Sequence, residues 1–540
     1  MLEYLLIRGK KGGACSYLTA LLKKHEKPLS AITKQGMSYR WIRIGVVCTV
    51  LFFPPPLKAA TYLDLDDPAY LLFSRLEAEG VIRSALLTTK PISRKEAARL
   101  LEEAGKNAEG RSDFIKSLVR ELSQRIGPES SGSSGVKPVD SLYVKYVTTN
   151  AAVRTLTYKL AREKEQALNY NNDGILYGHG SNGQAGITSR AEDLGRFSFF
   201  LNPEFTAAQG EGSELSFRKG YAVFDLGWDL IAGKKSQWWG PGHHGAILLS
   251  NNAEPFTMLE LTNPIPITLP WIFSYLGTYR FTYFVTQLEK DRADVPEPYF
   301  WGLRVNFKPH PNLEIGFERT ALLGGRGRPT DVSTWLNSMF GTREHDQEQN
   351  PGDQRAGYDL KLTLPFELQP LQVYWEEAGE ENRQRNSRMP YKLADLYGIY
   401  LPRLLWYERF SLRAEYATNH VSYWPDVWYT HGVYTAGYTY HGQIIGHHMG
   451  TDSRDLFAEL TCRFPEKNAR WSLAYDRSEH SLSGPVRERE HELSLNAHLN
   501  VAENTDLALT YGYSWMKNVD FVPGVVLRSN AAAGTITRRF

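Results

Sequence analysis

The sequence predicts an all-β transmembrane barrel of 16 to 18 antiparallel strands, preceded by a small α-helical domain. Three observations support this fold class. From about residue 140 to 540, apolar and polar residues alternate with a period of two, in runs of about ten residues. Short turns alternate with long polar connections, and aromatic residues gather at the ends of the runs. This combination is typical of barrels that expose an apolar face to lipid and a polar face to the lumen.

The clearest alternating run covers residues 299–308, where apolar side chains alternate with Arg304, Asn306 and Lys308. The same pattern recurs at residues 313–318, 358–364, 471–476, 492–499 and 506–515. The last predicted strand, 534–540, ends on the aromatic Phe540, as strands for outer-membrane assembly often do. A soluble β-sandwich or propeller is the alternative, but no blade-length repeat supports a propeller.

Composition excludes several classes of protein. Lys and Arg number 62 against 60 Asp and Glu, so the net charge of +2 does not indicate bulk nucleic-acid binding. The mean hydropathy of -0.40 argues against a helical membrane protein but is compatible with a barrel. Of three cysteines, Cys15 and Cys48 fall in or before a targeting segment, which leaves Cys462. One cysteine makes neither an intrachain disulfide nor a cysteine-based zinc site.

The N-terminal part is predicted to contain a secretory signal at residues 37–59. Arg40 and Arg43 precede the apolar run 44–53, and small residues follow at the expected cleavage site. The run is too short for a transmembrane helix, and a short buried helix is the alternative. Residues 1–36 are then a misassigned start or an extension.

Residues 60–127 are predicted to form a small helical domain. Asp67 can cap a helix whose first residue is Pro68, and Ser93 with Glu96 resembles a capping box. A third helix is expected to end at Gly127. The Ser/Gly-rich residues 128–139 are predicted to be a linker, and residues 140–540 the barrel.

The most unusual motif is Trp238-Trp239 followed by Gly-Pro-Gly at residues 240–242, with Asn251 and Asn252 nearby. Indole faces and side-chain amides suit a polysaccharide ligand, and the glycine-rich loop with Arg326 and Arg328 could add charge for an acidic glycan. The alternatives are that the two tryptophans anchor an inward-folded loop by packing, and that the arginines lie in a solvated loop.

Placed in such a barrel, these motifs resemble the capsule assembly (Wzi) family of outer-membrane proteins. The resemblance runs from about residue 61 to the end of the chain. It rests on residues 67–70 and 76–80, 238–242 with 249–253 and Pro255, 287–289 with 301–304 and 318–319, and 437–442 with 445–447 and 452–453.

The resemblance implies a monomeric barrel of about 18 strands in the cell outer membrane, with a periplasmic helical domain. It also implies a lectin-like role in holding capsular or exopolysaccharide, contact with outer-membrane lipid, and insertion by the barrel-assembly machinery. The motif positions give a predicted carbohydrate-binding set, to which the loop arginines are added: Trp238, Trp239, Asn251, Asn252, Arg326, Arg328, Tyr438, Tyr440 and Asp452.

Other functions are weighed on specific residues. A porin or export channel is the main alternative, but the long connection from Trp238 to Pro270 is suited to folding inward and closing the barrel. Inward-facing Arg304, Lys308, Glu314 and Glu318 are expected to form a lumenal charge ladder rather than a selectivity ring.

No enzyme, cofactor or metal is expected. The carboxylates at 376–377 and 380–381 are predicted to lie in a solvated loop. The pairs His243-His244 and His447-His448 do not predict a metal site, because adjacent histidines on a strand point to opposite faces and no carboxylate follows at a ligand spacing.

Overall fold

The computed structural model describes residues 58–127, 135–153, 155–158, 161–164, 168–210, 212–341, 352–382 and 390–540. The predicted extension 1–36 and the predicted signal 37–59, except for its last two residues, lie outside the described residues. Within these ranges, no helix is both long and apolar enough to cross a membrane.

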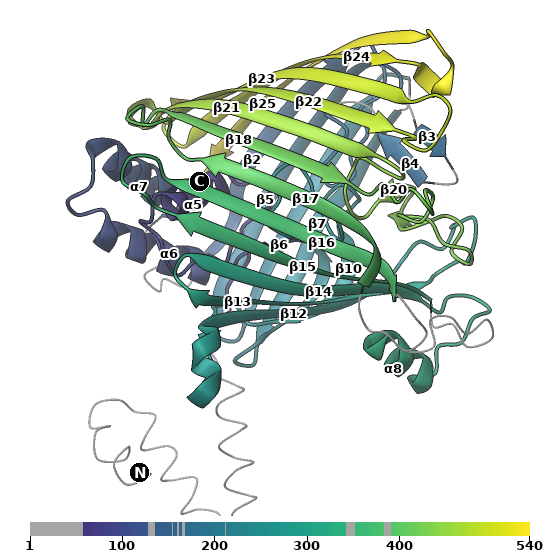
Figure 1. Ribbon diagram of the computed structural model, residues 1–540. Coiled ribbons are helices and arrows are strands. Elements are labelled where there is room, and N and C mark those ends of the chain that lie inside the picture. Colours follow the sequence, from purple (N-terminus) through teal and green to yellow (C-terminus); the bar gives the residue numbers. More distant parts are fainter. Residues whose placement is uncertain are drawn as a thin grey trace, which may run out of the picture. The chain divides into compact units, whose positions relative to one another are not determined.

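Eighteen of the described strands close into one antiparallel barrel in which each strand pairs with the next along the chain (Figure 1). β2 closes the ring on β25, with Ser141 opposite Arg539. The strands are β2 (Val136–Thr149), β5 (Gly180–Leu194), β6 (Phe197–Ala208), β7 (Gly212–Asp225), β8 (Asp229–Lys235), β10 (Phe256–Thr262), β12 (Thr278–Gln287), β13 (Tyr299–His310), β14 (Leu313–Leu323), β15 (Asp353–Leu364), β16 (Leu371–Asn382), β17 (Pro390–Leu401), β18 (Phe410–Thr418), β21 (Arg454–Phe464), β22 (Ala469–His480), β23 (Glu488–Ala502), β24 (Thr505–Lys517) and β25 (Val526–Arg539). The predicted transmembrane barrel is therefore confirmed.

The direction of the side chains distinguishes this barrel from a soluble sandwich. In β14, Phe317 points outward and is exposed, while Glu314 and Glu318 point into the lumen and are buried. The apolar face of the wall is thus outside and the polar face inside, as the alternation predicts for a lipid-facing barrel.

The two ends of the barrel differ. At one end, which we call the helical end, turns such as 310–313 and 502–505 are short. The opposite end, the loop end, carries long connections, including 236–255 and 419–453. Exposed aromatic residues ring the helical end, among them Trp271 in the 3₁₀ helix η3 (Trp271–Leu276) and Trp406 in the β17–β18 turn. This position suits a membrane–water interface.

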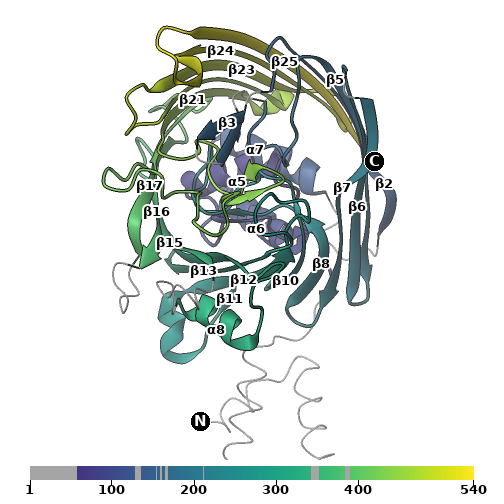
Figure 2. The ribbon, with the colours of Figure 1, turned by 90° about the vertical axis from the view of Figure 1, so that its right-hand side faces the viewer.

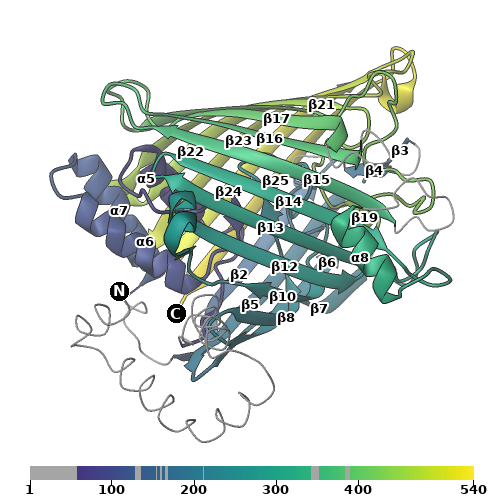
Figure 3. The same ribbon diagram turned by 60° about the horizontal axis from the view of Figure 1, so that its bottom comes forward.

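Several short strands, one helix and two 3₁₀ turns lie outside the eighteen barrel strands. β11 (Ile267–Thr268) adds to β12, and β3 (Thr155–Tyr158) pairs with β4 (Ala161–Lys164). The helix α8 (Val332–Phe340) lies outside the wall at the loop end (Figure 3). Two 3₁₀ turns, η4 (Pro465–Lys467) and η5 (Val519–Phe521), complete the set.

The helical domain contains α5 (Ala69–Ala78), α6 (Arg94–Asn107) and α7 (Asp113–Ile126). Ser93 caps α6 as predicted, because its Oγ accepts from the Glu96 N–H (3.0 Å). α5 begins one residue later than predicted, with Pro68 at the N-cap, and Asp67 Oδ1 accepts from the Ala69 N–H (2.8 Å). Viewed along the barrel, the three helices lie behind the lumen at the helical end (Figure 2).

Buried charges of the wall hold this domain. Glu77 of α5 contacts Lys308 and Lys361 at 2.8 Å each. Glu314 Oε1 accepts from the Thr88 hydroxyl at 2.6 Å. The predicted lumenal charge ladder is therefore present, and several of its residues bind the helical domain.

Candidate functional site

The double-tryptophan motif lies in the β8–β10 connection, residues 236–255, which we call the Trp loop. Trp238–Trp239 form the two-residue strand β9, and β9 pairs with β1 (Thr89–Lys90) of the helical domain. The Gly240 N–H also donates to the Thr88 carbonyl (2.8 Å). The loop therefore folds inward and joins the helical domain inside the barrel.

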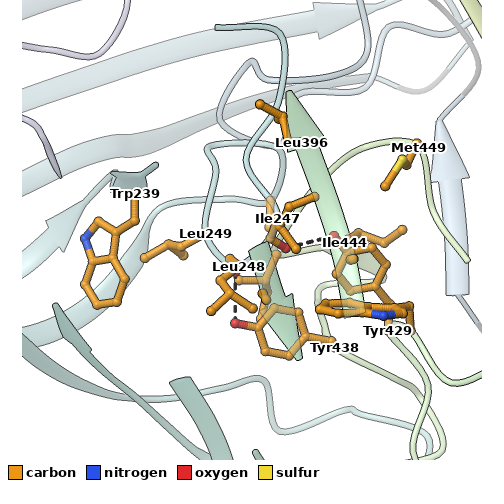
Figure 4. Packing of buried hydrophobic residues seen from close by; sticks show 14 of the residues in the cluster. Trp239, Ile247, Leu248, Leu249, Leu396, Tyr429, Tyr438, Ile444 and Met449 are labelled. Carbon is orange, nitrogen blue, oxygen red and sulfur yellow. Dashed lines mark hydrogen bonds between the residues drawn. The ribbon is translucent and has the colours of Figure 1, made fainter. Parts of the chain in front are cut away.

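Trp239 is an anchor of this loop. Its side chain is fully buried, and its ring centroid lies 5.4 Å from that of Phe284 on β12. A Cβ on Gly302 of β13 would lie within 2.6 Å of the Trp239 ring, so the wall needs glycine at this position to admit the indole. Figure 4 shows Trp239 beside Leu249 in the apolar cluster of the lumen. This geometry matches the packing alternative considered for the motif.

Trp238 has a different environment. Its ring lies 5.4 Å from Lys90 Nζ, and its Nε1–H finds no hydrogen-bond acceptor in the described part of the chain. It lines a cavity of about 390 Å³ between the helical domain and the Trp loop, the lumenal cavity, together with Asn251, Arg413 and Arg470. Burial lowers the pKa of Lys90 to about 8, with a smaller contribution from the positive charge of Arg413.

A second long connection, residues 419–453, packs against the Trp loop, and we call it the second loop. The Tyr438 hydroxyl donates to the Leu248 carbonyl (2.9 Å) and the Tyr429 hydroxyl to the Ile247 carbonyl (2.8 Å) (Figure 4). The second loop also contains the small hairpin of β19 (Thr439–Tyr440) and β20 (Gln443–Ile444). Together the two loops fill the lumen above the helical domain.

The two asparagines predicted to bind sugar donate hydrogen bonds to the backbone of other connecting segments. Asn251 Nδ2 donates to the Asn171 carbonyl (3.1 Å), and Asn252 Nδ2 donates to the Ile444 carbonyl (3.0 Å). The Tyr438 ring is fully buried, with the guanidinium of Arg355 at 4.2 Å from its centroid. These bonds hold the loops in place, and a sugar contact by these residues stays a prediction.

The remaining predicted residues lie apart from the double tryptophan. Tyr440 is half-buried against Phe256. Asp452 is buried and pairs with His420 at 2.7 Å. Arg326 is exposed and pairs with Glu297, and Arg328 lies over the Tyr434 ring. The structure therefore brings Trp238 and Asn251 to one cavity. It places Trp239 and Tyr438 in the apolar cluster, with Tyr440 packed against that cluster. The other four predicted residues, Asn252, Arg326, Arg328 and Asp452, lie elsewhere.

A second aromatic pair, Tyr423-Trp424, was missed in the sequence and is exposed at the loop end. Trp424 is 56% exposed, and Lys392 Nζ lies 3.9 Å from the centroid of one of its rings. It borders a cavity of about 150 Å³, the loop-end cavity, with Asp353, Asp426 and Thr430. Residues 423–426, Tyr-Trp-Pro-Asp, could have been found because they repeat an aromatic pair near a proline in a long connection.

The prediction that residues 376–377 and 380–381 form a solvated loop is wrong, because β16 continues to Asn382. Glu376 points into the lumen and accepts from the Ile247 N–H (2.6 Å). Glu377 points outward and accepts from the Tyr358 hydroxyl (2.6 Å). Adjacent strand residues face opposite sides, so these two carboxylates do not act on one substrate.

The histidine pairs also depart from expectation. They lie in the two loops and not on strands, and His244 and His448 meet two carboxylates from the wall, Asp455 and Asp476. The expectation that these histidines lie on strands is therefore wrong, and the two carboxylates reach them from positions that no ligand spacing in the sequence indicates. The reason is that Asp455 and Asp476 come from neighbouring strands, β21 and β22, so no short sequence spacing reveals them.

Known proteins resemble this chain over most of its length. The Wzi structure from Escherichia coli, described as a carbohydrate-binding β-barrel involved in group 1 capsule assembly, superposes with a TM-score of 0.68 at 20% identity, covering 89% of this chain and 100% of that one. An uncharacterised 55.8 kDa protein in the cps region of Klebsiella pneumoniae is 26% identical over 312 residues. That match covers 57% of this chain and 55% of the relative, so the chain spans about half the length of this relative.

The family model described as "Capsule assembly protein Wzi" matches residues 156–527. This range contains the Trp loop, the second loop and most of the barrel wall. The chain belongs to the Wzi family of capsule assembly proteins.

Proposed function

We propose that this protein is a lectin-like protein of the outer membrane that binds capsular or exopolysaccharide and anchors it at the cell surface. Family membership and the description of the Escherichia coli Wzi structure support this role. The observation that carries the proposal is the loop-end cavity, where an exposed indole borders a polar hollow on the end that a surface polymer would reach.

The chemistry of the loop-end cavity fits a sugar. The exposed Trp424 ring offers an apolar face for the C–H side of a pyranose. Asp426 and Thr430 offer acceptors and donors for hydroxyl groups, and Lys392 supplies a positive charge for an acidic unit. The lumenal cavity lies beneath the packed loops, so Trp238 is not the first side chain that an arriving polymer meets.

The proposal includes an orientation and partners. The helical end, with its short turns, lies in the periplasm, and the loop end faces outward. The monomeric barrel contacts outer-membrane lipid and is inserted by the barrel-assembly machinery. Ligand binding here involves no chemical step, so the protein acts as a binder and not as an enzyme.

A glycan-retention assay tests the proposal. Detergent-purified protein is run through gels containing the host's own surface polysaccharide, and the cell-attached polysaccharide of a deletion strain is measured in parallel. Trp424→Ala should lose most of the retention, whereas Trp406→Ala, an exposed indole at the helical end, should keep it. Retention that survives Trp424→Ala but is lost in Trp238→Ala would move the site to the lumenal cavity. No retention of the wild type, with unchanged cell-attached polysaccharide, would refute the lectin role.

The alternative of a porin or export channel is tested separately in planar bilayers. The packing of both loops and the helical domain in the lumen favours a closed barrel. A large, steady open conductance of the wild type would favour the channel.

A further inference from the structure

We infer that His244, His448, Asp455 and Asp476 form a binding site for a divalent transition metal of the zinc class. His244 comes from the Trp loop and His448 from the second loop. Asp455 and Asp476 come from β21 and β22 of the wall. Four separate segments therefore converge on one point inside the barrel, and the inference is independent of the proposed sugar binding.

The distances suit coordination. One ligand atom from each of the four side chains lies within 4.8 Å of the other three. Two of the contacts are shorter still, with His244 Nε2 at 3.2 Å from Asp476 Oδ2 and His448 Nε2 at 3.1 Å from Asp455 Oδ2. Ligands about 2.0–2.2 Å from a tetrahedral Zn²⁺ lie roughly 3.3–3.6 Å apart, so only a small contraction of the longer distances would close the site.

The four residues are buried, with relative exposures between 2% and 9%. Their environment also fixes the histidine rings. The Tyr170 ring stacks on His448 at 4.4 Å between centroids, and the Phe457 ring stacks on His244 at 4.0 Å. The aromatic walls exclude water and hold both imidazoles near the carboxylates, as a metal site requires.

With neutral imidazoles, the form that binds metals, the charge balance of the four residues favours a cation. Asp455 and Asp476 lie side by side in the interior, and within the described ranges their ion pairs run only to His448 and His244. Asp476 Oδ1 is buried and accepts no hydrogen bond from the described part of the chain. Two carboxylates without a lysine or arginine partner are costly in a buried site, and a divalent cation would neutralise both.

The donor set selects the metal. Two imidazole nitrogens and two carboxylate oxygens match the N/O ligands of Zn²⁺ and its neighbours in the transition series. Ca²⁺ and Mg²⁺ prefer sites made of oxygen alone and so fit poorly. Because the ligands come from both loops and from the wall, a bound metal would fasten the two loops to β21 and β22.

Metal analysis of the full-length, detergent-purified protein tests the site. The protein is stripped with EDTA, dialysed against micromolar ZnCl₂ and then against metal-free buffer, and its zinc content is measured. We expect about one zinc per chain in the wild type and less than a tenth of that in Asp455→Asn/Asp476→Asn and in His448→Gln. His491→Gln is the matched control, since His491 stacks on Trp515 of β24 outside this cluster, and it should keep its zinc.

Two further measurements keep the test decisive. Heat-modifiable migration on gels shows whether each variant still forms a barrel. If a variant does not fold, the test uses the wild type instead, stripped of metal and loaded with Co²⁺. We expect intense visible d–d absorption, which added Zn²⁺ should abolish. Wild-type protein that retains no zinc and gives no such absorption, or a folded double variant that retains full zinc, would overturn the inference.

Discussion

Glu77 of helix α5 and Lys308 of barrel strand β13 form a buried ion pair, with Oε1 2.8 Å from Nζ. Oε2 of the same carboxylate lies 2.8 Å from Nζ of Lys361 on β15. Lys361 Nζ also lies 2.9 Å from Glu314 Oε2, so Glu77 and Glu314 together balance the two lysines of the lumen wall. Without Glu77, Glu314 alone would balance both buried ammonium groups, so the Glu77 carboxylate helps to hold the helical domain against the wall.

The first prediction follows from this pair. Glu77→Gln keeps the size of the side chain but removes its charge, which leaves the two lysines undercompensated. Breaking a buried pair in this way typically costs about 3–5 kcal/mol. We expect the variant to lose a comparable part of its unfolding free energy, and its residues 58–127 to become sensitive to trypsin while the barrel resists.

Glu102→Gln is the matched control for this experiment. Glu102 pairs with Lys106 one helical turn away, and both side chains are exposed. Exposed pairs of this type contribute little to stability, so trypsin sensitivity should match that of the wild type. Equal digestion rates for Glu77→Gln and Glu102→Gln would contradict the proposed role of Glu77.

The second prediction concerns how the stabilisation by Glu77 changes at acidic pH. Burial raises the pKa of Glu77, but Lys308 and Lys361 together outweigh burial and hold the pKa below its ordinary value. The ionised carboxylate thus stabilises the seated domain above the unfolded pKa of about 4.3, and this contribution is lost as the pH falls below that value. We expect the melting temperatures of wild type and Glu77→Gln to differ most near neutrality and to converge below about pH 4, as followed by circular dichroism. A constant difference down to the lowest pH would contradict this.

The fold could be predicted because the alternation of inward and outward side chains in a barrel strand involves residues that are adjacent in the sequence. In β13 the side chains of Arg304 and Asn306 point inward and those of Leu303 and Val305 point outward, so a period of two is visible in the sequence. The hydrogen bonds of Asp67 and Ser93 at the starts of α5 and α6 are similarly local. Such local patterns can be recognised in a sequence without any knowledge of long-range contacts.

The interior could not be predicted, because its contacts join distant segments. Nothing in residues 236–255 reveals that Trp238 pairs with Lys90 of the helical domain, or that Glu376 accepts a hydrogen bond from Ile247. The histidine–aspartate cluster was missed for the same reason. Residue type identified the Trp loop as unusual, but only the closed barrel shows that its two indoles lie in different environments.

The third prediction separates Trp239 from surface tryptophans. Trp239→Ala removes a fully buried indole from the apolar cluster, and such truncations cost about 3–5 kcal/mol. The Trp loop should then pack less well on β12 and β13. In planar bilayers we expect frequent open events for the variant, whereas Trp406→Ala should remain as closed as the wild type. Unchanged conductance and melting temperature in Trp239→Ala would show that the indole does not anchor the loop.

The fourth prediction concerns Lys90. Burial lowers the pKa of this lysine to about 8. A lowered pKa means that the folded state binds this proton more weakly than the unfolded state, so the charged lysine opposes folding below about pH 8. This penalty fades as the pH rises from about 8 toward 10.4, the ordinary lysine pKa. Lys90→Met, similar in length but uncharged, should therefore raise the melting temperature by roughly 2–4 °C at pH 7. The increase should shrink steadily between pH 8 and 10.4, and a variant less stable than wild type at pH 7 would show instead that the cation's contact with Trp238 outweighs its burial.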